Sequence, residues 1–113
     1  MFQEVKESLP ISGDEYDNQI IREIKACALD MTRTAEIVLP GEILISKDER
    51  TGAVVDSSTL TDELIITTIS TWCNMRIGNP PNYDNLLKAY ESLKGRLRLN
   101  NAYTVYGDGA VTE

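Results

Sequence analysis

The stretch GNPP at residues 78–81 constrains the fold of this chain most, because no helix can run through it. Glycine suits the position just after a helix, and two successive prolines prevent the helix from continuing. Apolar residues recur at three- and four-residue spacing on both sides of the break. The pattern predicts one helix over residues 60–77 and another over residues 83–99, with Asn82 as the N-cap of the second.

The segment before the break, LTDELIITTISTWCNMRI, is the most apolar of the predicted helices. Ile65, Ile69 and Trp72 share one face, and further apolar residues widen that face around the helix. Such a wide apolar surface predicts burial on several sides, so this helix is expected at the centre of a bundle. Its threonines and serine are poor helix formers, and packing against the rest of the fold is therefore expected to stabilise it.

Another apolar stripe predicts a long helix from Asp14 to Ala35. Gly13 and Asp14 supply a break and a candidate N-cap, and acidic side chains in the first turn complement the helix dipole. The stripe consists of Tyr16, Ile20, Ile24, Cys27, Met31 and Ala35. Ahead of it, residues 2–8 can form a short helix that ends before Pro10.

Between the helices, the pattern changes after Pro40 and Gly41. Two runs that favour β-structure, Ile43–Ser46 and Ala53–Asp56, flank the polar sequence KDERTG. They predict a β-hairpin over about residues 42–57, whose loop presents Asp48, Glu49 and Arg50 as candidate contact residues. A lone two-stranded hairpin is marginally stable in water, so it needs the bundle or a neighbouring chain to pack against.

The last predicted helix has a stripe of apolar residues that is expected to be buried, namely Tyr83, Leu86, Leu87, Tyr90, Leu93 and Leu97. Residues 100–113 show no helical period and are expected to form an extended tail with a short β-like centre. The apolar residues of this tail are Tyr103, Val105, Tyr106 and Val111. Two interpretations of the tail stay open: a frayed terminus, or a strand that adds to the sheet edge of a partner.

Taken together, the patterns predict a mainly α fold. It is a small bundle of a short N-terminal helix and three longer helices, with a β-hairpin between the second and third helices and an extended C-terminal tail. The length favours one domain, residues 1–113, with a helical body over about residues 2–99. The expected core consists of Ile20, Ile24, Ile65, Ile69, Trp72, Leu86, Tyr90, Leu93 and Leu97.

The composition argues against catalysis, because the chain contains no histidine and only two cysteines. Histidine is the commonest general base, a usual zinc ligand and the partner of most serine and cysteine nucleophiles. Cys27 and Cys73 lack the spacing of a disulfide framework or a zinc site, and core packing is the favoured interpretation for both. The paired carboxylates fall at expected helix starts or at the hairpin tip. No catalytic residue, metal site or cofactor is therefore expected.

The net charge of −7 is unevenly distributed along the chain. Residues 1–63 carry 14 acids and 6 bases, a net −8, whereas residues 64–113 carry 4 acids and 5 bases, a net +1. Gripping nucleic acid requires clustered lysine and arginine, so an acidic chain is not built for it. Such a chain suits the wall of a passage through which DNA slides without adhering.

A basic end on the last helix comprises Lys94, Arg96 and Arg98, preceded by Lys88. One interpretation is a solvated face that complements the negative end of the helix dipole. The other is a subunit interface, in which these side chains meet an acidic partner such as the N-terminal half of another copy. The N-terminus shows no signal-peptide pattern and no apolar run is long enough to span a membrane, so a cytoplasmic protein without membrane contact is expected.

The order of these segments resembles the head–tail connector, or adaptor, proteins of long-tailed bacteriophages and related prophages. Such proteins carry an acidic D-x-x-I helix start, a later apolar helix, a break with glycine and proline, and a tyrosine- and leucine-containing helix that leads into a tail. The matching residues are Asp17 and Ile20; Gly78, Pro80 and Pro81; Tyr83, Tyr90, Leu93 and Leu97; and Tyr103 and Thr104. The resemblance covers roughly residues 2–39 and 60–104.

The resemblance implies a structural virion protein whose copies assemble into a ring of about a dozen subunits. The ring would lie beneath the portal protein, extend the DNA channel without binding a DNA sequence, and receive a stopper or tail-completion protein. Its implied location is the head–tail interface of the virion, after assembly in the cytoplasm of the bacterial host. The resemblance further implies that the C-terminal tail reaches the portal or a neighbouring subunit.

A small acidic helical module with a regulatory or DNA-binding role is the alternative from another class. The acidic balance and the lack of a basic recognition helix weigh against it. An enzyme is disfavoured further, because no set of catalytic residue types converges in the predicted fold.

Overall fold

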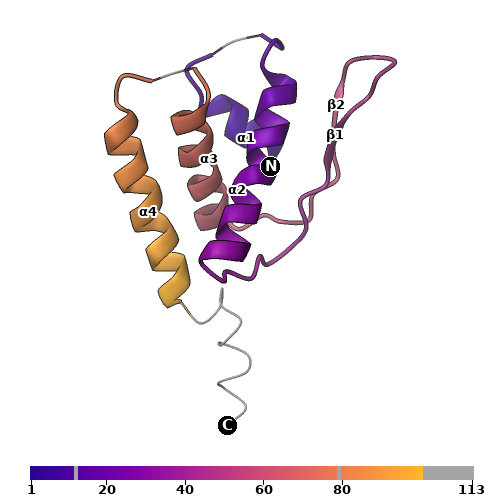
Figure 1. Cartoon of the computed structure of the whole chain (residues 1–113). Coiled ribbons are helices and arrows are strands. Elements are labelled where there is room, and N and C mark those ends of the chain that lie inside the picture. Colours follow the sequence, from indigo (N-terminus) through magenta and orange to yellow (C-terminus); the bar gives the residue numbers. More distant parts are fainter. Residues whose placement is uncertain (12, 79, 101–113) are drawn as a thin grey trace.

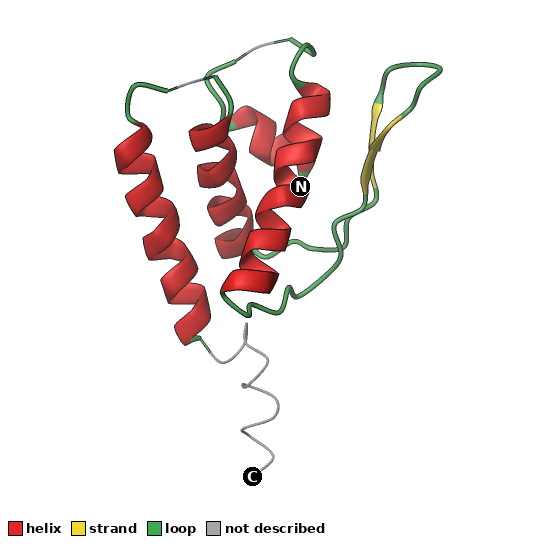
Figure 2. Ribbon diagram, in the orientation of Figure 1, coloured by secondary structure: helices red, strands yellow, loops and turns green. Residues whose placement is uncertain are grey.

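The computed structural model describes residues 1–11, 13–78 and 80–100. In this part of the chain the elements follow the order α1 (Phe2–Glu7), α2 (Asp17–Thr34), β1 (Ile45–Lys47), β2 (Val54–Asp56), α3 (Glu63–Arg76) and α4 (Tyr83–Leu99). The fold is therefore mainly helical with one small antiparallel hairpin between α2 and α3, as predicted (Figures 1 and 2). The predicted tail lies outside the described residues, apart from Asn100.

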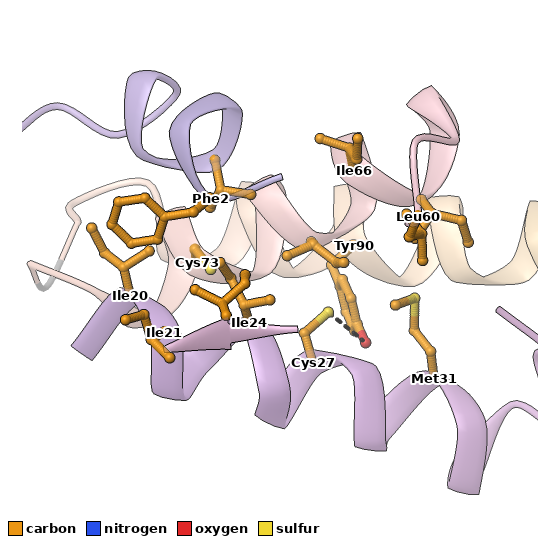
Figure 3. Close-up of a cluster of buried hydrophobic side chains, with 14 of the residues drawn as sticks. Phe2, Ile20, Ile21, Ile24, Cys27, Met31, Leu60, Ile66, Cys73 and Tyr90 are labelled. Atoms are coloured by element: carbon orange, nitrogen blue, oxygen red, sulfur yellow. Dashed lines mark hydrogen bonds between the residues drawn. The ribbon is translucent and has the colours of Figure 1, made fainter. Parts of the chain in front are cut away.

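Helix α3 is the centre of the bundle, because it packs against α1, α2 and α4. Figure 1 shows α3 between α4 on one side and α2 on the other, with the hairpin beyond α2. The core forms where these helices meet and includes Ile24, Ile69 and Cys73, each with no exposed surface (Figure 3). The wide apolar surface of α3 thus packs on several sides, which explains why a helix rich in threonine is stable here.

The ends of α3 follow the chemistry of the sequence. The Asp62 side chain accepts a hydrogen bond from the backbone N–H of Ile65 at 3.1 Å, as an N-cap does. Residues 60–62 precede the helix, so the predicted start was too early. At the other end Gly78 adopts φ +83, the left-handed conformation that glycine takes just after a helix.

The start of α2 differs from its prediction, because the helix begins at Asp17 and the Asp14 side chain does not cap it. Lys6 of α1 instead holds both carboxylates, with Nζ–O distances of 3.0 Å to Asp14 and 2.8 Å to Asp17. Asp17 is buried, and its Oδ1 accepts no well-aligned hydrogen bond, so the ion pair with Lys6 compensates its charge. Through these ion pairs with Lys6, the two acids hold the start of α2 against α1.

Helix α4 buries less of its apolar stripe than predicted. Tyr90 and Leu97 are buried, whereas Tyr83 is 43% exposed and Leu87 is 37% exposed. The reason is that α4 is an outer helix that packs mainly on α3, so only a narrow strip of its surface is covered. Asn82 is the N-cap residue of α4, as predicted, but its side chain makes no capping hydrogen bond.

The other predicted core residues lie where the helices meet, but not all are fully enclosed. Ile20, Ile65 and Ile69 are entirely buried, as is Ile24. Trp72 and Leu86 are partly buried and pack against this core, and Leu93 is partly buried on α4. Trp72 nevertheless makes a T-shaped contact with Tyr90, with ring centroids 5.1 Å apart.

Candidate assembly surfaces

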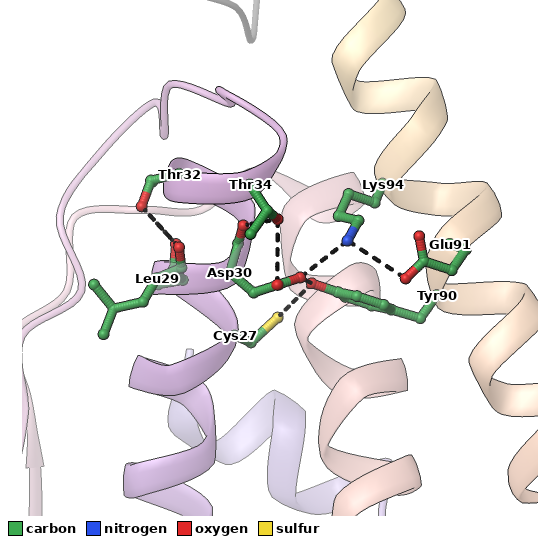
Figure 4. A network of polar contacts seen from close by, with 9 residues as sticks. Cys27, Leu29, Asp30, Thr32, Thr34, Tyr90, Glu91 and Lys94 are labelled. Carbon is green, nitrogen blue, oxygen red and sulfur yellow. Dashed lines mark hydrogen bonds and ion pairs between the residues drawn. The ribbon is translucent and has the colours of Figure 1, made fainter.

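A partly buried polar network joins α2 to α4 across the front of α3 (Figure 4). The Tyr90 hydroxyl donates to Oδ2 of Asp30 at 2.5 Å, and the Lys94 ammonium donates to the same oxygen at 3.1 Å. The Cys27 thiol lies 3.8 Å from the Tyr90 hydroxyl and donates to it, and the Lys94 ammonium also lies 5.0 Å from the centre of the Tyr90 ring. Tyr90 thus contacts side chains of both α2 and α4, and these contacts fix the position of the two helices relative to each other.

The electrostatics of this network fit a structural role. Burial would raise the pKa of the Asp30 carboxyl, but the hydrogen bonds from Tyr90 and Lys94 outweigh it and hold the pKa below its usual range. Burial and the neighbouring thiol and carboxylate raise the pKa of Tyr90 above its ordinary value. At neutral pH these shifts keep Asp30 an ionised carboxylate and Tyr90 a neutral phenol.

A second polar link lies between α2 and α3. The indole N–H of Trp72 donates to Oε1 of Glu23 at 3.0 Å, and Nε of Arg76 lies 3.5 Å from the same oxygen. The guanidinium of Arg76 also stacks over the Trp72 ring, 5.1 Å from its centroid. These contacts stabilise the packing of α2 on α3, and they engage the Glu23 carboxylate with both Trp72 and Arg76.

The three residues of the predicted basic end of α4 differ in how far they are exposed. Lys94 is mostly buried, with 15% of its side chain exposed, because it pairs with Asp30 and Glu91 within the same chain. Its charge is therefore paired within its own chain, and its contact with another subunit stays a prediction. Arg96 and Arg98 are exposed on the last turn of α4.

The hairpin is anchored at its base and projects beyond the bundle (Figure 2). Ile45 is buried against the core, and the Asp56 carboxylate accepts a hydrogen bond from the Phe2 backbone N–H at 2.8 Å. Partial burial would raise the pKa of Asp56, but hydrogen bonds from Ser58 and from the Phe2 N–H lower it well below its usual range. The N-terminus of α1 thus holds the hairpin in place.

The three predicted contact residues of the hairpin loop have different surroundings. Asp48 is partly buried and its Oδ1 accepts the backbone N–H groups of Arg50 at 2.8 Å and Thr51 at 3.3 Å, so it shapes the turn. Glu49 and Arg50 are exposed at the tip. The tail residues predicted to bind a partner, Tyr103, Val105, Tyr106 and Val111, lie outside the described residues.

An apolar groove on α2 was not foreseen from the sequence. It has a volume of about 420 Å³ and lies between the outer face of α2 and the segment that leads to β1. Its lining consists of Lys25, Ala28, Leu29, Thr32, Leu39 and Ile43. Leu29 is 51% exposed and points away from α4 (Figure 4). Leu29 falls outside the apolar stripe of α2. An apolar residue on the otherwise polar face of this helix was the feature of the sequence that could have indicated the groove.

The described residues show no cluster suited to metal binding. In residues 1–11, 13–78 and 80–100, no group of three or more histidine, cysteine or acidic side chains is placed to hold a metal ion. Both cysteines are buried, and burial raises the pKa of the Cys73 thiol to about 12. Among these same residues, no helix has the length and apolar character needed to span a lipid bilayer.

The fold and its surfaces define a class of protein: a small helical body with internal polar ties, a projecting hairpin and exposed apolar side chains suited to contacts with other proteins. The model of one family, the phage connector proteins, matches residues 1–104. The chain therefore belongs to the phage connector protein family. Searches among curated proteins and among solved structures each found no match. The family assigns the chain a structural role in the phage particle, as a head–tail connector.

Proposed function

We propose that this chain is the repeating subunit of a homo-oligomeric ring between the portal and the stopper or tail of a phage. Family membership over residues 1–104 is the observation that carries the proposal. A closed ring of about a dozen identical copies is the geometry by which one small chain can encircle a channel. The ring would continue the path of the DNA out of the head.

The charge of the chain supports a channel role. The net charge is −7, and the chain holds 18 acidic against 11 basic residues. Like charge between the wall and DNA keeps the DNA mobile, whereas clustered cations would retain it. The proposed channel therefore guides DNA without recognising its sequence.

Two segments are proposed as contacts to other virion proteins. The tail residues Tyr103, Val105, Tyr106 and Val111 would reach the portal or a neighbouring subunit, with apolar side chains filling pockets of that partner. The hairpin tip, with Glu49 and Arg50 exposed, would meet a neighbour or the tail machinery. Arg96 and Arg98 on α4 would meet an acidic partner surface.

Electron microscopy of portal-containing particles, prepared with and without this protein, tests the proposal. We expect ring-shaped density below the portal only in particles that contain the protein. A protein that stays monomeric and never joins such particles would contradict it.

Deletion of residues 100–113 should leave a folded helical protein that no longer joins the portal, and unchanged incorporation would remove the tail from the proposal.

A further inference from the structure

The large apolar side chains that the described residues leave exposed fall into two groups on different sides of the chain. One group surrounds α2 and the hairpin: Leu29, Val38, Leu44 and Val55. The other belongs to α4: Tyr83, Leu87 and Leu99. Exposed apolar residues that line a pocket, as Leu29 does, or that lie one helical turn apart, as Tyr83 and Leu87 do, mark interaction surfaces more often than isolated ones do.

The two groups differ in shape. Leu29 of the first group lines the groove together with Leu39 and Ile43, and this groove is shallow and mostly apolar. The second includes Tyr83 and Leu87, one helical turn apart on the convex surface of α4. Within one subunit they cannot cover each other, because Leu29 points away from α4 and α3 lies between α2 and α4 (Figures 1 and 4).

The charges around the two surfaces are complementary. Glu36 and Glu42 are exposed in the segment that borders the groove, and this segment, residues 35–44, contains no lysine or arginine. On α4 the exposed Lys88 follows Leu87 directly, and Asp84 follows Tyr83. Lys25 in the groove lining would pair with Asp84, and Lys88 with Glu36 or Glu42, whereas Glu91 is already paired with Lys94 of its own chain.

From these observations we propose that the α2 groove of one subunit receives α4 of a second copy, with Leu87 as the apolar anchor against Leu29. The inference rests on the proposed ring and specifies which two faces of the subunit meet. Such a contact is heterologous, because each copy offers one groove and one α4 surface. Contacts of this kind repeat head to tail and close into a ring when the rotation between copies allows it.

A mixing experiment with two variants tests the asymmetry of the contact. Leu29→Glu places a charge in the groove, and Leu87→Glu places one on α4; both positions are exposed, so circular dichroism should show an intact helical fold. Each variant alone should self-associate at least about tenfold more weakly than the wild type, both in sedimentation velocity and in incorporation into portal-containing particles. Mixed in equal amounts, they should form a dimer that grows no further, because one intact groove and one intact α4 remain.

Thr67→Glu, at an exposed position on α3, is the matched control and should assemble like the wild type. If either glutamate variant loses its helical signal, Leu29→Ser and Leu87→Ser replace the pair. Normal assembly of either glutamate variant, or a mixture that forms no dimer, overturns the proposed contact. If the wild type still forms a ring in that case, the proposed function stands. A wild-type protein that forms no oligomer in solution or on particles overturns the proposed function and this contact with it.

Discussion

The Tyr90 hydroxyl donates a hydrogen bond to Asp30 at 2.5 Å, across 60 residues of sequence and between two helices that otherwise touch little. The ring of the same tyrosine packs edge-on against Trp72 of α3. Tyr90 therefore links three helices, through its hydroxyl to α2 and through its ring to α3. This link sets how α4 presents its outer surface, on which the proposed subunit contact depends.

Replacing Tyr90 by phenylalanine should destabilise the fold by about 1–2 kcal/mol, because the Asp30 carboxylate loses a donor inside a partly buried network. The ring contact with Trp72 is retained, so the helical content should be unchanged. Urea denaturation followed by circular dichroism measures the effect. Tyr83→Phe is the matched control, since Tyr83 is 43% exposed, and it should leave the free energy of unfolding unchanged. Equal stability of Tyr90→Phe and wild type would contradict this role.

Asp30 should make the stability depend on pH in the acid range. Its pKa is lowered in the folded state, so its contribution is present above the unfolded value of about 3.9 and is lost as pH falls through the folded value. Asp30→Asn should therefore be less stable than wild type at pH about 7, and the difference should shrink below pH about 4. Denaturation curves of both proteins across this range give the comparison. A difference that stays constant with pH would show that the charge of Asp30 contributes nothing.

Both cysteines should be inert toward thiol reagents in the native protein. Cys27 and Cys73 have no exposed surface, and burial raises the pKa of each thiol, so neither is available as a thiolate near pH 8. Absorbance with a disulfide reagent should show no fast labelling at pH about 8 and labelling of both thiols in denaturant. Rapid reaction of either thiol in the absence of denaturant would contradict their place in the core.

Two glycines should respond to alanine in opposite directions. A Cβ atom at Gly41 would lie 2.7 Å from Cα and 2.8 Å from N of Leu60, so Gly41→Ala must push two backbone segments apart and should cost about 1–3 kcal/mol. Gly95 lies inside α4, and apart from the neighbouring residues and backbone of α4 itself nothing lies within 4 Å of the added Cβ. Gly95→Ala should therefore stabilise by about 0.5–1 kcal/mol through helix propensity. Thermal unfolding of the two variants beside wild type gives the sign of each change. The same sign for both would reject this account of the backbone contacts.

Much of the fold was predictable because it depends on local chemistry. The Gly-Pro break at residues 78–81 separates α3 from α4, and the β-favouring runs around KDERTG form the hairpin. The apolar period of α2 identified residues that are indeed buried, among them Ile20 and Ile24. The start of α2 was less accurate, because Lys6 of α1 uses Asp14 and Asp17 as ion-pair partners, and a local pattern does not contain that contact.

The surfaces were predictable only in part. The sequence marked Lys94, Arg96 and Arg98 as one basic end, but only tertiary contacts show that Lys94 pairs with Asp30 and is withdrawn from the surface. The α2 groove was missed, because Leu29 and Ile43 are brought together by the path of the chain between α2 and β1. The spacing within one helix holds no information on a segment folded back against it.

The sequence by itself determined where the chain must break between helices, which faces are apolar and that acid outweighs base, since these follow from residue type and order. The tertiary structure alone decided how much of each apolar face is covered. Helix period identifies residues that share a face, but the width of the neighbouring element sets the area removed from water. Because α4 lies at the edge of the bundle, Tyr90 is buried while Leu87 on a similar face stays exposed, available for another protein.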